Sequence, residues 1–404
     1  MTVYSSAFAY VNHRFIRLPF AIGLMMSSMF ISLLILVFCK FFPGAFNFRS
    51  IISSIDLPQI LLGSMLSFML FAGALPLRLD ILKEQKVPVV AFSTISVIIS
   101  TFLIGLASFS LLKIFGINVS LINCMMFGAI ISPTDPLAVL SILRQAKIPT
   151  SVEMQLSGES LFNDGMAIVV FLAIQQAAKV SADLHWQDVL ILFFRQSVGG
   201  IFLGYLLGWA GSRLIGSVND YKVEVMISIG VVMGGYSIAT LAGTSGPLAM
   251  VMAGIMIGNY RKQLGTNTQS RVLLEKFWEI ADYILNALLF AMMGFELLLI
   301  HFERYYLVVG LICIVIALGV RYFSLYVPVL ILKMQKTIGN KTLLLLTWGG
   351  LRGGLSIALA LSLQPGQQKD LWITLTYIVV SFSILVQGLT ISKLARYKRI
   401  EQDE

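Results

Sequence analysis

Charged residues and cysteines are both scarce in this sequence. Charged residues make up 12% of the 404 residues and hydrophobic residues 57%, a composition typical of a membrane protein. There is no Cys-x-x-Cys pair and no even-numbered set of cysteines, which argues against a disulfide framework and a zinc site. The cysteines fall in or beside apolar segments, where we expect buried, inert thiols: Cys39, Cys124 and Cys313.

Long apolar runs are abundant instead, and each is long enough to cross a hydrocarbon layer roughly 30 Å thick. The sequence predicts an all-α polytopic membrane protein with twelve complete spans: 18–39, 58–78, 88–114, 119–142, 155–178, 188–212, 223–243, 247–260, 277–300, 305–332, 341–363 and 371–392. Residues 1–10 are too few to span, and they lack the basic region and cleavage site of a signal peptide. They predict a shortened first helix.

The basic residues predict the orientation in the membrane. A net charge of +9 does not indicate a nucleic-acid partner here, because the basic residues lie in short loops and form no stripe that could follow phosphates. Alternate loops on one side hold Arg14, Arg17, Arg78, Lys83, Lys86, Arg144, Lys147, Arg213, Lys222, Arg261, Lys262, Arg271, Lys276, Lys333, Lys336, Lys341, Lys393, Arg396, Lys398 and Arg399. The opposite loops hold Lys40, Arg49, Lys113, Lys179, Arg304 and Lys369. The positive-inside rule therefore predicts a cell-membrane protein with its amino terminus outside and its carboxyl terminus in the cytoplasm.

The segment SPTDP interrupts the fourth complete span. Pro133 and Pro136 have no backbone N–H to donate, and each disfavours helical geometry in the residue before it, so the helix must break there. Unpaired backbone within a membrane is tolerated only where protein buries it or where it lines a polar cavity. Asp135 sits at the break beside Thr134, and an intramembrane carboxylate usually marks an ion or proton path.

The next span carries a second polar cluster in QLSGESLFNDGMAIVVF. Ser160 and Asp164 are four residues apart and share one helix face, and Glu159 and Asn163 share the adjacent face. The first pair offers a hydroxyl and a carboxylate to a small hard cation, which prefers oxygen ligands. Glu159 is a buried charge that needs a partner, which the Asn163 amide supplies only in part.

Arg352 is the predicted partner of Glu159. It falls in the middle of the apolar run TLLLLTWGGLRGGLSIALAL, with two glycines before it and two after it. Glycines weaken a helix, so a second interrupted span is predicted here, with its breaks at Gly350 and Gly353. An arginine at this depth needs an acid, and charge alone makes Glu159 the best candidate.

The two interruptions fall in equivalent places in two halves of the chain. Counting the shortened helix as the first span, the breaks lie in spans five and twelve, and an odd separation of seven predicts inverted six-helix repeats. We expect scaffold and dimerisation helices in 1–86, core ion-translocation helices in 87–186, a linker helix and scaffold helices in 187–302, core helices in 303–398, and a short cytoplasmic tail in 399–404.

The motifs SPTDP, GESLFNDG and GGLRGGLSIALAL, in this order and spacing, resemble the signatures of the monovalent cation:proton antiporters. The resemblance is to the sodium/proton exchanger (NhaP-like) branch with an Asn-Asp pair, and it covers essentially the whole chain, including YVNHRFIRLPFAIGLM. It implies a 13-helix fold with inverted repeats and two crossed, unwound helices. It also implies a homodimer without a cofactor, whose core bundle moves against a dimer scaffold as Na+ and H+ are exchanged.

The same resemblance assigns the site residues. The residue matching Asp164 binds cation and proton alternately, helped by those matching Ser160, Thr134 and Asp135. The residues matching Glu159 and Arg352 form a buried ion pair linked to Asn163. Because an amide cannot titrate, Asn163 leaves Asp164 as the single cycling group, which predicts electroneutral exchange of one cation for one proton.

The sequence departs from the family pattern in three places. Relatives often carry an acid in the third span, where FAGAL places Ala72, so an accessory acidic ligand from that helix is expected to be missing. The first helix is expected to be truncated. No long tail follows residue 404, so regulation by tail-binding partners is not expected.

Some of these residues also occur in proteins with other functions. A membrane aspartyl protease could use Asp135 and Asp164 as a dyad, but its Gly-x-Gly-Asp pattern is absent and Arg352 would have no role. A Ser-His site is not indicated, because the histidines all lie near loop ends: His13, His185 and His301. A passive cation channel is the more serious rival. The sequence leaves the choice among Na+, Li+ and K+ open, since site size and ligand number decide selectivity.

Overall fold

The structure is a computed structural model that describes residues 2–41, 57–135, 140, 150–179, 186–263, 268–297, 304–334, 338–364, 368–391 and 393. Within these residues the regular structure is helical, apart from one isolated antiparallel β-bridge between Asp135 and Leu351. Eight of the described helices are long and apolar enough to cross a membrane. The predicted all-α membrane fold is therefore confirmed.

The first half of the chain forms helices that follow the predicted spans closely. They are α1 (Thr2–Val11), α2 (Phe20–Phe41), α4 (Leu57–Ile60), the π-helical turn η2 (Leu61–Met65), α5 (Leu66–Ala74), α6 (Leu79–Glu84), α7 (Lys86–Ser93), α8 (Ile95–Ile114), α9 (Leu121–Ile131) and α11 (Thr150–Lys179). The short α1 agrees with the predicted shortened first helix, and a π-helical turn, η1 (Asn12–Ile16), follows it.

The second half contains the longest helices. They are α12 (Trp186–Gly216), α13 (Tyr221–Leu241), α14 (Gly246–Gln263), α15 (Thr268–Glu296), α16 (Arg304–Ile331), α17 (Asn340–Gly349), α18 (Gly354–Leu361), α19 (Lys369–Phe382) and the π-helical turn η4 (Ser383–Gln387). Both predicted interruptions are present. The helix α9 ends at Ile131, within the predicted span 119–142, and the predicted span 341–363 is divided between α17 and α18. The total of thirteen helices and the inverted repeat stay predictions.

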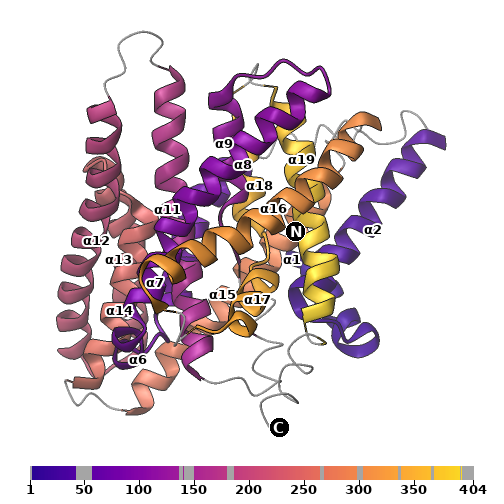
Figure 1. Ribbon diagram of the computed structural model, residues 1–404. Helices are drawn as coiled ribbons and strands as arrows, with labels where there is room; N and C mark the ends of the chain where they lie inside the picture. The colour runs from indigo at the N-terminus through magenta and orange to yellow at the C-terminus, as the bar shows by residue number, and fades with distance from the viewer. Residues whose placement is uncertain are drawn as a thin grey trace, which may run out of the picture.

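The helices form a bundle in which distant segments pack side by side (Figure 1). One group contains α12, α13 and α14, α2 packs along α15, and α8 packs along α9 and α16. Small residues permit the closest approaches, as they commonly do in membranes. A Cβ added at Gly204 on α12 would lie 2.2 Å from the carbonyl oxygen of Ala249 on α14.

The two interruptions lie inside this bundle rather than at its edge. The helix α18 packs against α9 and α19, and α11 packs against α9, α7 and α14. Every residue of α18 is buried. The described backbone of the two breaks, at 132–135 and 350–353, is therefore surrounded by protein, the condition under which such backbone is tolerated in a membrane.

Candidate functional site

The two helix breaks meet in space. The backbone N–H of Asp135, in the first break, donates a hydrogen bond of 2.7 Å to the carbonyl oxygen of Leu351, in the second. Glycine makes this approach possible, because a Cβ on Gly353 would lie 2.6 Å from both the Cβ and the Oδ2 of Asp135. Residues more than two hundred positions apart thus form a single site.

Side chains of α11 stabilise the first break. Ser160 donates its hydroxyl to the carbonyl oxygen of Thr134 at 2.5 Å, and the Nδ2 of Asn163 donates to the Thr134 hydroxyl at 3.0 Å. These bonds satisfy polar groups that the broken helix leaves unpaired. Pro133 lies at the break as predicted, and Pro136 lies outside the described residues.

Side chains of η4 stabilise the second break. The backbone N–H of Arg352 donates to the Ser383 hydroxyl at 2.9 Å, and that hydroxyl donates to the Oε1 of Gln387 at 2.6 Å. The Nε2 of Gln387 in turn donates to the carbonyl oxygen of Trp348 at 3.1 Å. Hydrogen bonds from neighbouring helices therefore stabilise both of the predicted breaks.

In the structure Glu159 forms its ion pair with Arg321, not with Arg352, which the sequence predicted. The Glu159 carboxylate forms a hydrogen-bonded ion pair with Arg321 of α16, and both side chains are almost completely buried. The Nη1 of Arg352 instead donates to the carbonyl oxygen of Gly350 at 2.8 Å. Arg352 caps an unwound carbonyl within its own break, and the charge of Glu159 is compensated from an uninterrupted helix.

Arg321 reaches the site because Gly350 leaves room for it. A Cβ on Gly350 would lie 2.9 Å from the Nε of Arg321 and 3.2 Å from the Cγ2 of Thr134. The sequence did place Arg321 within a span, which marks an intramembrane charge that needs a partner. Charge alone could not decide which of the three arginines within predicted spans, Arg195, Arg321 and Arg352, pairs with Glu159.

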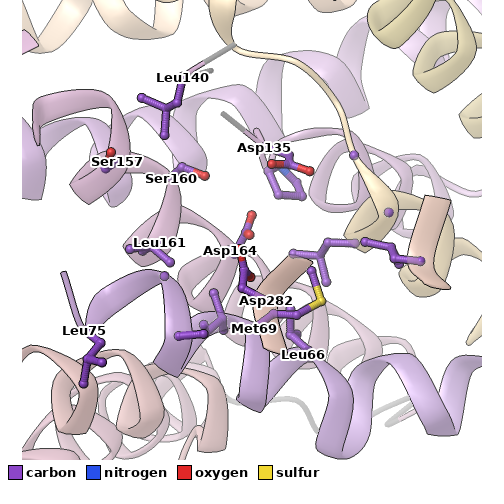
Figure 2. Close-up of a pocket in the computed structure, with 18 of the residues that line it drawn as sticks. Leu66, Met69, Leu75, Asp135, Leu140, Ser157, Ser160, Leu161, Asp164 and Asp282 are labelled. Atoms are coloured by element: carbon purple, nitrogen blue, oxygen red, sulfur yellow. The ribbon is translucent and has the colours of Figure 1, made fainter. Parts of the chain in front are cut away.

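A cavity of about 470 Å³ adjoins the crossing of the two breaks. Asp135, Ser160 and Asp164 line it and lie together near the centre of the view in Figure 2. Glu159 and Asn163 are not among the residues that line it. The predicted separation of α11 into two polar faces is therefore present, with the Ser160–Asp164 face turned to the cavity.

The structure also places residues differently from their predicted roles. Thr134 is buried and does not line the cavity, and both its carbonyl and its hydroxyl already accept hydrogen bonds from α11. Ala72 lines the cavity, so α5 presents a methyl group there, at the position where the family resemblance led us to look for an acid.

Sequence reasoning missed Asp282 of α15, which also lines the cavity (Figure 2). A signal for it was present, because Asp282 lies within the predicted span 277–300 and intramembrane carboxylates are rarely without a role. It was overlooked because α15 has neither a proline break nor a glycine cluster. The packing of α15 beside α5 and α18 could not be read from its local sequence.

We expect Gly353→Ala to weaken the crossing of the breaks. The added Cβ would overlap Asp135, and overpacking of this kind typically costs about 1–3 kcal/mol. The temperature of thermal unfolding in detergent should therefore fall. The control is Gly319→Ala on α16, where a Cβ meets nothing within 4 Å and little change is expected. Equal unfolding temperatures of the two variants would contradict the close contact at Gly353.

Comparison with known sequences identifies a family that matches almost the whole chain. The family model described as "Sodium/hydrogen exchanger, transmembrane" matches residues 3–397. The Na(+)/H(+) antiporter NhaP of Pseudomonas aeruginosa is 40% identical over 393 residues, which cover 96% of this chain and 93% of that protein. The Na(+)/H(+) antiporter NhaH of Halobacillus dabanensis is 34% identical over 354 residues, covering 86% and 83%.

Comparison with solved structures gives the same result for the fold. The sodium proton antiporter MjNhaP1 from Methanocaldococcus jannaschii superposes with a TM-score of 0.74, covering 98% of this chain and 95% of that one. The two sequences are 20% identical in this alignment. The helical arrangement is therefore shared even where the sequences have diverged.

Proposed function

This chain belongs to the sodium/hydrogen exchanger family, as its three motifs predicted, and from that premise we propose that it is a secondary active antiporter exchanging Na+ for H+ across a membrane. The observation that carries the proposal is the cavity at the crossed breaks, where the Ser160 hydroxyl and the Asp164 carboxylate face the same space. Such oxygen atoms are the ligands that small hard cations prefer. Na+ and H+ are the substrates, and the proposed exchange needs neither a cofactor nor catalytic chemistry.

Asp164 is the proposed exchange group. Within the described part of the chain, no hydrogen bond or ion pair fixes Asp164 in one charge state. Ser160 already donates to the backbone of Thr134 and keeps its oxygen lone pairs for a cation. Proton and cation then compete for one carboxylate, so that each displaces the other.

Asp135 is proposed to keep its charge throughout the cycle. It packs against Gly353, which precedes the first residue of α18, and a helix amino terminus favours a neighbouring negative charge. Its backbone N–H is held by Leu351. A fixed Asp135 charge attracts a cation to the cavity and leaves Asp164 as the group that titrates.

The interrupted helices and α11 are proposed to form a core that moves against a scaffold containing α12, α13 and α14. This division follows from which helices contribute the polar groups and which contribute apolar packing. We further propose a homodimer in the cell membrane, as the family resemblance implies. The loop charges support an amino terminus outside and a carboxyl terminus in the cytoplasm.

The proposed function is tested with purified protein in proteoliposomes containing a pH-sensitive dye. Addition of Na+ should dissipate an imposed proton gradient, and the apparent KM for Na+ should rise as pH falls because protons compete for Asp164. Li+ and K+ are tested in the same way, and a response to K+ alone would assign a K+/H+ antiporter instead. Cation flux without proton movement would identify a passive channel and overturn the proposal.

Exchange is predicted to be electroneutral. Since Asn163 carries no titratable proton, one cation replaces one proton on Asp164 and no net charge moves. The rate of Na+/H+ exchange should be the same when the membrane potential is clamped at different values with potassium and valinomycin. A rate or an equilibrium end point that shifts with the potential would contradict the single-carboxylate mechanism.

A further inference from the structure

Asp282 is a third carboxylate in the cavity, and the proposed exchange at Asp164 does not use it. It comes from α15, which carries no part of either helix break, and it is half-buried. Figure 2 shows Asp282 in the same central region as Asp135 and Asp164. A carboxylate is costly within a membrane and is seldom retained there without a role.

The neighbouring amide fixes the position of this carboxylate. The Nδ2 of Asn286, one helical turn further along α15, donates to the Oδ1 of Asp282 at 2.9 Å and to its carbonyl oxygen at 2.9 Å. Asn286 is 5% exposed, and its own Oδ1 has no hydrogen-bond partner in the described part of the chain. The Oδ1 of Asp282 is thus held in place, and the Oδ2 of Asp282 and the Oδ1 of Asn286 are the two further oxygens that could act as ligands.

Asp282 comes from a different helix than the other two carboxylates of the cavity. Asp135 lies in the first break and Asp164 lies on α11, whereas Asp282 lies on α15. The hydrogen bonds from Ser160 and Asn163 to Thr134 at the proposed exchange site do not involve α15. Asp282 is therefore a contribution of α15 to the cavity, added to the helices that form the proposed exchange site.

Two more acids connect Asp282 to the outside of the bundle. Glu275 and Glu279 precede it by seven and three residues, a spacing that places all three on one face of α15, and all three line the cavity. Glu279 is exposed, and the Glu275 side chain is 37% exposed and paired with Arg271. From Glu275 to Asp282 the helix rises by about 10 Å.

We propose that Asp282, held by Asn286, is a waiting site for the transported cation, which binds there on its way between the Glu275 end of the cavity and Asp164. This inference rests on the proposed exchange of Na+ for H+. The acids draw cations into the cavity from one side of the membrane, and Asp282 replaces part of the hydration shell before the ion reaches Asp164. Because α5 places the uncharged Ala72 at the cavity, the additional negative charge there comes from Asp282 of α15.

The waiting site predicts an effect on one face of the membrane only. Clefts lined with charges of one sign raise the local concentration of counter-ions by a factor of 10 or more, so Asp282→Asn should raise the apparent KM for Na+ about tenfold at the face where the cavity opens. At the opposite face the KM should be unchanged. The maximal rate at saturating Na+ should stay within about twofold of that of the unmodified protein, because Asp164 is intact.

The measurement compares everted with right-side-out membrane vesicles at fixed pH, so that Na+ meets one face in each preparation. Asp188→Asn is the matched control, since it removes an exposed carboxylate of α12 that does not line the cavity, and its KM should be unchanged at both faces. Asp282→Glu retains the charge and should restore most of the affinity. Asp282→Ser, which also lacks the charge, is measured in parallel in case the amide variant does not fold.

A KM raised at one face alone supports the waiting site, whichever face that is. A KM that is unchanged at both faces, or raised equally at both, overturns it, since a general distortion of the protein would act on both sides. These outcomes presuppose Na+-dependent proton flux in the unmodified protein. Absence of that flux would count against the proposed function, which is a different result.

Discussion

Asp164→Asn is expected to abolish Na+-dependent proton flux while leaving the protein folded. The substitution preserves the shape of the side chain but removes the group that accepts a proton and neutralises a cation. The hydrogen bonds that stabilise the first break come from Ser160 and Asn163, and those at the second come from Ser383 and Gln387, so the substitution removes none of them. Flux is measured in proteoliposomes with a pH dye, and folding is measured by thermal unfolding in detergent.

The control for Asp164→Asn is Asp188→Asn, which makes the same chemical change at an exposed position outside the cavity. The control should exchange Na+ at the normal rate. Retained cation-dependent flux in Asp164→Asn would rule out the single exchange group. Loss of the folded protein would instead assign Asp164 a structural role.

Arg321→Ala is expected to cause the largest loss of stability. It leaves Glu159 charged, buried and unpaired, and removing one partner of a buried pair typically costs about 3–5 kcal/mol. Glu159→Gln should also destabilise the protein, because Arg321 is then unpaired. The free energy of unfolding is measured in detergent for each single variant and for the double variant.

The double variant tests the contact itself. Substitutions of residues that contact each other do not have additive effects on stability. Arg321→Ala combined with Glu159→Gln should therefore cost less free energy of unfolding than the sum of the two single changes. The same cycle with Arg352→Ala should show a smaller coupling, since the Nη1 of Arg352 donates to the Gly350 carbonyl. Equal coupling of the two arginines to Glu159, or additivity in the first cycle, would contradict the observed pairing.

The sequence by itself determined the membrane class, the helix ranges and the two breaks. Span length is set by the thickness of the membrane, and the predicted 223–243 and the observed Tyr221–Leu241 differ by two residues at each end. The breaks follow from local chemistry, because proline lacks an N–H and consecutive glycines weaken a helix. Helical periodicity also separated Ser160 and Asp164 from Glu159 and Asn163 within one segment.

Only the tertiary structure decided which of these segments meet. The Glu159–Arg321 pair joins residues 162 positions apart in the sequence, and neither residue carries a local signal for the other. Asp282 likewise enters the cavity because α15 packs beside α5 and α18. Propensity and hydropathy act over a few turns of helix, whereas ion pairs and cavities depend on how whole helices cross. How the helices cross depends on close approaches such as the one between Gly353 and Asp135, which a Cβ at Gly353 would prevent.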